Sequence, residues 1–340
     1  MDRVPGTKID RYEDRESRMR FGKMKIFCGS SHPTLGEEVC QQVGLRPGYE
    51  DISLGRYERT VFSNENIFVK LDDSVRGKDV YLIQTMSSPI HENIMEALIM
   101  IDALKRDSAW RINLVVPYLA YSRSDKKDQP RVPITARLMA NMIETAGADR
   151  YMTIDLHSGQ IQGFFNIPGD SLTAFHLLSE YVKGKNLENL VVVATDLGFV
   201  KDARNWAEAL GVPIAIVEKR RSGNDENAVA MSLIGDVRDK NVLLVDDEVN
   251  TGGSIVNAYN VVKQHGALDV SFAFSHAFFS EKSKERLASI DLKEIIFTNT
   301  LPVKPKYMLP NMTILSVAPM LAEVMIRAHE GRSVGELFDE

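Results

Sequence analysis

The chain has 340 residues, of which 41 are lysine or arginine and 47 are aspartate or glutamate, so its formal net charge is −6. This length is sufficient for two domains, and the acidic balance argues against nucleic acid or an anionic membrane as the main partner. The two cysteines have no CxxC spacing, and no apolar run approaches the roughly 20 residues of a membrane-spanning helix, which together indicate reduced thiols in a cytoplasmic protein.

The chain begins with a charged segment and then alternates strand-like and helix-like patterns. Residues 1–23 carry charges of both signs and no apolar segment, so they indicate a solvated extension and not a signal peptide. In the first half, three short apolar runs are typical of buried parallel strands: Val80–Thr85, Ile112–Pro117 and Tyr151–Asp155. Between the first two, a helical period places four apolar residues on one face: Ile94, Leu98, Ile101 and Leu104.

The second half repeats this pattern. Five further runs predict strands: Leu190–Ala194, Pro213–Val217, Val242–Val245, Val270–Phe274 and Ile295–Thr298. Helices are expected at Ile255–Gln264 and Met320–His329. We therefore predict an α/β protein of two tandem domains, residues 24–167 and 168–340, each with a largely parallel sheet flanked by helices. Ligands of such sheets bind beyond the carboxyl ends of the strands, where the polar motifs of this chain fall.

The motif that follows Val242–Val245 predicts a binding site for a ribose phosphate. Asp246 and Asp247 come directly after the strand, and a small polar turn then leads into a helix; its residues are Asn250, Thr251, Gly252, Gly253 and Ser254. The glycines let backbone N–H groups approach an anion closely, and the helix start adds a partial positive charge. The two carboxylates would repel phosphate, so we expect them to bind sugar hydroxyls or a divalent cation. The alternative is an acidic strand end followed by an ordinary turn.

Two other strand ends carry groups that suit phosphate or metal. Asp155 and His157 are two residues apart, so an extended strand would project both from the same face, where they could hold a metal or contact phosphate oxygens. A structural histidine is the alternative. The loop after Ile112–Pro117 contains Arg123, whose planar guanidinium can bind phosphate or stack on a base. The lysines that follow it are more typical of a solvated surface.

A third constellation is Val217-Glu-Lys-Arg-Arg221, which is followed by a polar segment without an apolar anchor, Ser222–Asn227. Three consecutive cations that lead into such a segment are suited to a lid that brings positive charge onto a polyphosphate. Transfer of a phosphoryl-type group requires positioning and charge stabilisation more than covalent chemistry. The alternative interpretation is ordinary surface charge.

From Met24 onward the chain resembles the ribose-phosphate diphosphokinases, which make phosphoribosyl pyrophosphate (PRPP). The resemblance is carried by segments spread over the chain: Ser74-Val-Arg-Gly77, Met100-Ile-Asp-Ala-Leu-Lys105, Pro133-Ile-Thr-Ala-Arg137, Glu144-Thr-Ala-Gly147, Gln160-Ile-Gln-Gly-Phe-Phe165 and Lys219-Arg-Arg221. It implies that the anomeric hydroxyl of ribose 5-phosphate attacks the β-phosphorus of ATP and gives PRPP and AMP, with Mg²⁺ required. It also implies two phosphoribosyltransferase-like domains and a homo-oligomer, a hexamer or its dimer unit.

The resemblance further implies roles for individual residues. The 5-phosphate would be held by the turn from Asn250 to Ser254, and the ribose hydroxyls by Asp246 and Asp247. ATP would be contacted by six residues: Asn64, Asn66, Arg123, Ser124, Asp125 and His157. The metal would lie at two residues, His157 and Asp196. The catalytic pair that stabilises the transferring diphosphate would be Lys219 and Arg221.

Three departures from the family pattern keep other functions open. The family commonly has acids where Asn64, Asn66 and Asn250 occur. Amides both donate and accept hydrogen bonds, so they are compatible with ATP while changing base selectivity. A diphosphokinase with a different nucleotide donor or ribose-containing acceptor is therefore an alternative, and so is a catalytically silent PRPP-synthetase-associated regulatory protein. Retention of His157 and the catalytic pair argues against the silent protein.

Overall fold

The computed structural model describes residues 22–221 and 229–337, without the side chains of residues 219–221 and 229–231. The chain forms two compact units, one of Met1–Leu172 with Ala318–Glu340 and the other of Thr173–Val317. The expected fold class, two α/β halves with largely parallel sheets, is confirmed. The extension expected at the N-terminus lies almost wholly outside the described residues.

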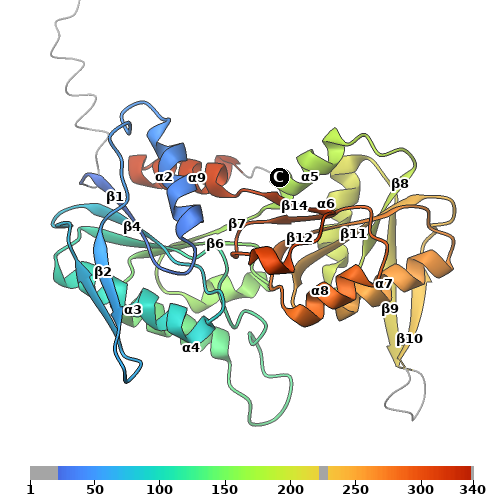
Figure 1. Cartoon of the computed structure of the whole chain (residues 1–340), viewed down its shortest axis with the longest axis horizontal. Helices are drawn as coiled ribbons and strands as arrows, with labels where there is room; N and C mark the ends of the chain where they lie inside the picture. The colour runs from blue at the N-terminus through green and yellow to red at the C-terminus, as the bar shows by residue number, and fades with distance from the viewer. Residues whose placement is uncertain (1–21, 222–228, 338–340) are drawn as a thin grey trace, which may run out of the picture. The chain divides into compact units, whose positions relative to one another are not determined.

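Within its described part, the first unit contains a five-stranded parallel sheet with the order β1-β4-β5-β6-β7. The strands are β1 (Met24–Cys28), β4 (Asp79–Ile83), β5 (Arg111–Val115), β6 (Arg150–Ile154) and β7 (Gly169–Leu172). The helices are α2 (Pro33–Gly44), α3 (Ile90–Arg106), α4 (Thr135–Ala146), α9 (Ala318–Glu330) and two short 3-10 helices, η1 (Gly159–Phe164) and η4 (Gly335–Leu337). Every residue of β4 is buried, because α2 and α9 cover one face of the sheet and α3 and α4 the other (Figure 1).

An antiparallel hairpin, β2 (Tyr57–Val61) with β3 (Ile67–Leu71), packs on α3 through β3. The apolar runs of the sequence do not predict this hairpin, since its residues alternate between half-buried and exposed positions.

In the second unit, the described residues form a seven-stranded sheet with the order β10-β9-β8-β11-β12-β13-β14. Its strands are β8 (Leu190–Ala194), β9 (Ile214–Arg221), β10 (Val229–Ile234), β11 (Asn241–Val249), β12 (Val270–Ala277), β13 (Ile295–Thr298) and β14 (Met312–Leu315). Its helices are α5 (Phe175–Gly184), α6 (Val200–Leu210), α7 (Gly253–Gln264), α8 (Glu281–Ala288), η2 (Leu197–Phe199) and η3 (Pro305–Tyr307). β10 is antiparallel to β9, and the other neighbours are parallel. Stacked Phe272, Phe274 and Phe297 rings fill part of the core.

The last helix corrects the predicted domain division. The helix expected at Met320–His329 is present as α9, but it belongs to the first unit and packs against α2. Its apolar residues Leu321 and Val324 are fully buried there, and His329 Nδ1 lies 2.7 Å from Asp79 Oδ2 at the start of β4. The apolar face of α9 is buried against the first unit, and α9 therefore belongs to that unit although it follows the second unit in the sequence.

Two smaller expectations concern the membrane and the cysteines. Both cysteines, Cys28 and Cys40, carry free thiols. Among the helices of the described residues, none has the length and apolar character needed to cross a membrane.

Candidate functional site

We call the predicted ribose-phosphate site, which consists of Asp246, Asp247 and the turn 250–254, the cradle. Its acidic pair, Asp246 and Asp247, lies in the last part of β11 and not beyond its end. The sequence predicts an end at Val245, but pairing with β12 continues to Val249, opposite Ala277. Pairing with β8 stops sooner, at Val245 opposite Ala194. From Asp246 onward, the described residues give β11 no ladder partner on the β8 side, where Thr195 and η2 contact the strand instead.

Asp246 is held in one orientation by two hydrogen bonds. Thr195 Oγ1 donates to Asp246 Oδ2 at 2.7 Å, and the backbone N–H of Asp247 donates to Asp246 Oδ1 at 2.9 Å. Burial raises the pKa of Asp246 to about 8, and the negative charge of Asp247 adds to that rise. The pair therefore carries less than its full negative charge at neutral pH until a cation or a ligand donor compensates it.

The turn after β11 has the backbone expected of a helix start. Gly252 adopts a left-handed conformation, with φ 72°, and α7 begins at Gly253, two residues before the predicted Ile255. The first N–H groups of a helix have no partner inside it, so the start of α7 offers donors to an anion directly after β11. Asn250 and Thr251 are exposed, whereas Gly252 is buried.

Asp196 lies at the carboxyl end of β8, which is next to β11, and the Lys219–Arg221 segment lies at the carboxyl end of β9, on the other side of β8. Asp196 follows β8 and caps η2, since its Oδ1 accepts from the N–H groups of Gly198 at 2.8 Å and Phe199 at 3.3 Å. The Lys219–Arg221 segment is part of β9 and pairs with β10 through Arg221 opposite Val229, whereas the sequence predicts a strand that ends at Val217. The side chains of Lys219 and Arg221, and the lid segment Ser222–Asn227, lie outside the description.

The predicted pairing of Asp155 with His157 on one strand face is wrong. β6 ends at Ile154, and Asp155 has a positive φ of 42°, so the backbone turns there and the alternation of an extended strand does not continue. His157 is exposed and lies just before η1. Its predicted contact with nucleotide or metal remains a prediction that does not depend on Asp155.

The loop after β5 is joined to η1 by a buried carboxylate. Asp125, expected at ATP, is buried, and its Oδ2 accepts from Gln160 Nε2 at 2.5 Å. Ser124 Oγ accepts from the backbone N–H of Thr135 at 3.5 Å. Asp125 and Ser124 therefore hold the loop, and their contact with ATP remains a prediction. Arg123, next to them in this loop, is exposed. The link brings the segments of Arg123 and His157 together within the first unit.

Asn64 and Asn66 lie in the tight turn between β2 and β3, and both are exposed. The Asn66 N–H donates to Asn64 Oδ1 at 3.2 Å. The hairpin is fixed to α3 by Arg59, whose Nε donates to the fully buried Glu96 at 2.9 Å. Sequence patterns gave no sign of this anchor, because its partners are far apart along the chain.

The anchor yields a stability prediction. Arg59→Gln is expected to lower the free energy of unfolding by about 2 kcal/mol, because a charge-assisted hydrogen bond to a buried carboxylate is lost. Lys70→Gln on the same hairpin is the matched control: Lys70 pairs with Glu58 at 3.3 Å while both side chains are more than half exposed, so its effect should stay within about 0.5 kcal/mol. Urea titration and hydrogen exchange in β2 and β3 measure both variants. An equal decrease in the free energy of unfolding in both variants would contradict the prediction that the buried ion pair stabilises the hairpin more than the exposed one.

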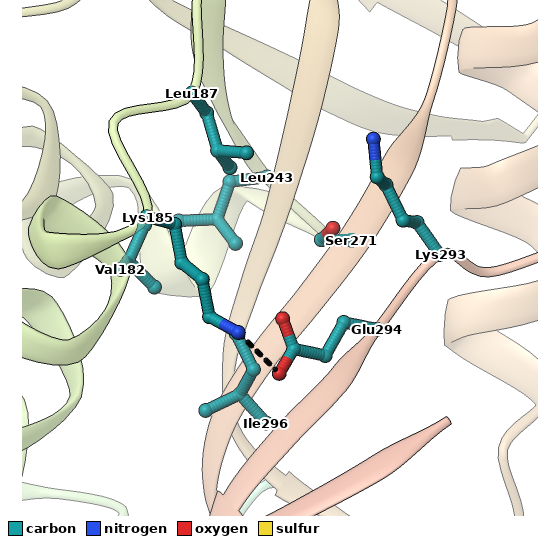
Figure 2. Close-up of a pocket in the computed structure, with 8 residues that line it drawn as sticks. All are labelled: Val182, Lys185, Leu187, Leu243, Ser271, Lys293, Glu294 and Ile296. Carbon is teal, nitrogen blue, oxygen red and sulfur yellow. Dashed lines mark hydrogen bonds and ion pairs between the residues drawn. The ribbon is translucent and has the colours of Figure 1, made fainter. Parts of the chain in front are cut away.

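A pocket of about 290 Å³ lies in the second unit, at the end of the sheet opposite to the cradle. It lies at the amino ends of β11, β12 and β13, and Figure 2 shows the ion pair between Lys185 and Glu294, 3.2 Å, on one side of it. Glu294 also accepts from Tyr181 and Thr313, each at 2.7 Å. Because the polar motifs lie at the carboxyl ends of the strands, we do not assign this pocket to the substrates.

Two residues that contact the cradle were missed by the sequence patterns. Thr195 holds Asp246, and its position at the end of an apolar run next to Asp196 was a usable signal. Arg286 donates from Nη1 to the Thr251 carbonyl at 3.0 Å. Arg286 lies on another helix, and no local pattern connects it with the turn.

The fold and this strand-turn-helix arrangement define an α/β protein of the class that binds ligands at the carboxyl ends of parallel strands. A family model described as the N-terminal domain of ribose phosphate pyrophosphokinase matches residues 24–147, and one described as the phosphoribosyl synthetase-associated domain matches residues 224–339. The chain belongs to the ribose-phosphate pyrophosphokinase family.

Similar proteins cover nearly the whole chain. A ribose-phosphate pyrophosphokinase of Campylobacter jejuni is 46% identical over 314 residues, which are 92% of this chain and 98% of that protein. The enzyme of that name from Bacillus subtilis is 43% identical and covers 93% of this chain and 97% of its own. The crystal structure of phosphoribosylpyrophosphate synthetase from Mycobacterium smegmatis superposes with a TM-score of 0.85 at 40% identity, covering 91% of this chain and 99% of that one.

Proposed function

We propose that this protein transfers the β,γ-diphosphate of ATP to the anomeric hydroxyl of ribose 5-phosphate. A bond forms between that hydroxyl oxygen and the β-phosphorus, the bond from the β-phosphorus to the oxygen of the α-phosphate breaks, and the hydroxyl proton is released. The products are PRPP and AMP. The observation that carries the proposal is the acid pair and glycine turn at the end of β11, in a chain that matches relatives of this name over nearly its full length.

The acceptor would lie along the end of β11. We assign the 5-phosphate to the turn from Asn250 to Ser254, because the start of α7 supplies N–H donors there. Asp246 and Asp247 would accept from the vicinal hydroxyls of the ribose. The Thr195 hydrogen bond supports this role, since it fixes one carboxylate before the sugar arrives.

The donor would be bound by residues of the first unit. We assign Arg123 and His157 to the phosphates of ATP, and Asn64 and Asn66 to the nucleotide base. Lys219 and Arg221 would stabilise the charge on the diphosphate as it transfers. The buried Asp125 and the anchored Ser124 would act indirectly, by holding the loop of Arg123.

The chemistry of the donor set suits Mg²⁺. Asp196 and the β11 carboxylates provide oxygen ligands at neighbouring strand ends, as Mg²⁺ prefers, whereas a direct bond from His157 nitrogen fits it less well. In the described part of the chain, no group of three such side chains converges, and Asp196 is the residue that we assign to the ion. When bound, Mg²⁺ neutralises phosphate charge. We also propose a cytoplasmic homo-oligomer, a hexamer or its dimer unit, as the family resemblance implies.

A second candidate is a diphosphokinase with another nucleotide donor. It is favoured by the amides at Asn64 and Asn66, which occupy an exposed turn and can donate as well as accept. A different ribose-containing acceptor is the corresponding possibility at Asn250.

One assay tests these proposals. The full chain is incubated with Mg²⁺, ribose 5-phosphate and each common nucleoside triphosphate in turn, and the nucleoside monophosphate and PRPP are measured. AMP and PRPP formed in equal amounts from ATP are expected. Turnover only with another triphosphate or another sugar phosphate would favour the second candidate, and no turnover with any pair would contradict enzymatic activity.

Lys219 gives the matching mutational prediction. Lys219→Ala is expected to lower kcat about a hundredfold to a thousandfold, because it removes a charge that acts on the transferring group, and to leave the KM for ribose 5-phosphate near that of the wild type. Lys183→Ala, which removes an exposed lysine at the end of α5, is the control and should retain activity. A Lys219→Ala enzyme with unchanged kcat would remove Lys219 from the catalytic pair.

A further inference from the structure

The side chain of Arg286 on α8 runs along both glycines of the cradle turn. Its Nη1 donates to the Thr251 carbonyl oxygen at 3.0 Å. A Cβ placed on Gly253 would lie 3.1 Å from this Nη1, and one on Gly252 would lie 3.6 Å from the Cβ of Arg286. The close approach at Gly253 is therefore possible because that residue has no side chain.

The backbone that carries Arg286 is held in place by the capping and packing of α8. Ser280 caps this helix: its hydroxyl accepts from the Ser283 N–H at 3.3 Å, while Ser283 Oγ accepts from the Ser280 N–H at 2.7 Å. Ser283 and Leu287, on either side of Arg286 along the helix, are buried. A capped helix with buried residues on both sides of Arg286 fixes the position of its Cα, and the hydrogen bond to Thr251 then needs only the side chain to be ordered.

The contact determines which way the peptide after Thr251 faces. A trans peptide directs its C=O and its N–H to opposite sides. Because Arg286 draws the Thr251 carbonyl toward α8, the N–H of Gly252 is directed away from α8. Carbonyl oxygens repel phosphate and N–H groups attract it, and the guanidinium adds a permanent positive charge next to the turn.

We propose that Arg286 is a positioning residue for the acceptor, which holds the turn in its anion-binding conformation and thereby sets the affinity for the 5-phosphate group. This inference rests on the proposed binding of ribose 5-phosphate at the cradle. It adds a residue from a separate helix, one that the sequence motifs did not connect with the substrate.

The test compares three variants of the full chain: Arg286→Gln, Arg286→Lys and Lys282→Gln. Lys282 is the matched control, since it is exposed on the same helix and its substitution removes the same charge. Binding of ribose 5-phosphate without nucleotide is measured by calorimetry, and KM values for ribose 5-phosphate and ATP are measured in turnover.

Arg286→Gln should weaken ribose 5-phosphate binding about tenfold to a hundredfold and leave the KM for ATP near the wild-type value. Arg286→Lys, which keeps the charge and a donor, should recover part of the loss.

Several outcomes would overturn the inference. One is equal ribose 5-phosphate affinity in Arg286→Gln and Lys282→Gln. Another is a rise of both KM values with a loss of thermal stability, because that pattern reports a general disturbance of the fold. Should Arg286→Gln not fold, Arg286→Lys decides, and an unchanged affinity in it contradicts the proposal. A wild type that binds ribose 5-phosphate without forming AMP would sink the transfer reaction alone, whereas one that binds no ribose 5-phosphate overturns both.

Discussion

Asp246→Asn is expected to lower kcat/KM for ribose 5-phosphate by about a hundredfold, because one of the two vicinal hydroxyls of the sugar loses its carboxylate acceptor. The substitution preserves shape: an amide oxygen can accept from the Asp247 N–H, and the amide nitrogen can donate to the Thr195 hydroxyl. The KM for ATP should change much less. Steady-state kinetics with each substrate varied in turn measure this split.

The same variant should be more stable than the wild type in alkali. Burial raises the pKa of Asp246 from 3.8 to about 8. At a pH between these two values, the carboxyl group is protonated in the folded chain and ionised in the unfolded chain. The stabilisation by this neutral carboxyl is complete below about pH 4 and is lost as the pH rises through about 8. Asparagine cannot ionise, and Asp246→Asn should therefore raise the melting temperature by a few degrees at pH 9 and leave it unchanged at pH 4.

Asp236→Asn is the control for this pH dependence. Asp236 is exposed, and its pKa is lowered by the Arg238 N–H and by Lys240, so its small contribution is present at neutral pH and is lost in acid, with the opposite sign to that of Asp246. A stability difference for Asp246→Asn that does not grow with pH would contradict the raised pKa.

Asp79→Asn is expected to cost about 3 kcal/mol of stability in the first unit, because it leaves the partly buried Arg111 without its counter-charge. Arg111 donates to both carboxylate oxygens of Asp79, at 2.7 and 2.6 Å, and Asn113 donates to Oδ1 at 2.8 Å. His329 on α9 reaches the other oxygen. Burial alone would raise the pKa of Asp79, but the hydrogen bonds from His329 and Arg111 outweigh it and hold the pKa below the usual value.

The direction of that shift fixes the pH range of the effect. A carboxylate whose pKa is lowered by folding stabilises the folded state at pH values above its pKa in the unfolded chain. This stabilisation is lost as the pH falls through its pKa in the folded chain. Denaturant titration at pH 7 should thus show the full loss, and hydrogen exchange should place it in β4 and α9 and not in β11. Asp102→Asn, which breaks the exposed pair with Arg106 on α3, should leave both measurements near the wild type. Loss of protection in β11 as well would contradict a network confined to the first unit.

Sequence patterns predicted the elements whose signal is local. Continuous apolar runs identified β4, β5, β6 and β8 because both faces of these strands are covered, and the 3.6-residue period identified α3. The hairpin β2–β3 was not predicted, since its residues are only half buried. The extension of β9 to Arg221 results from pairing with β10, and the assignment of α9 results from packing on α2. Both result from tertiary contacts, which a short segment of sequence does not reveal.

Local and non-local signals also differ within the candidate site. The cradle could be predicted because its acids, its glycines and the start of its helix are adjacent in the chain. The turn at Asp155 could not be predicted, because its positive φ depends on how the chain leaves β6. Arg286 and Gln160 act across 35 residues each, on Thr251 and Asp125, so only the folded chain reveals them.

The return of α9 to the first unit makes the second unit an insertion between β7 and α9. During synthesis, residues 173–317 are therefore complete before the ribosome supplies the helix that pairs His329 with Asp79. We expect the second unit to be able to fold while the first still lacks part of its core. A nonsense codon after Val317 would accordingly damage the amino-terminal half of the molecule, and leave intact the half in which the reading frame stopped.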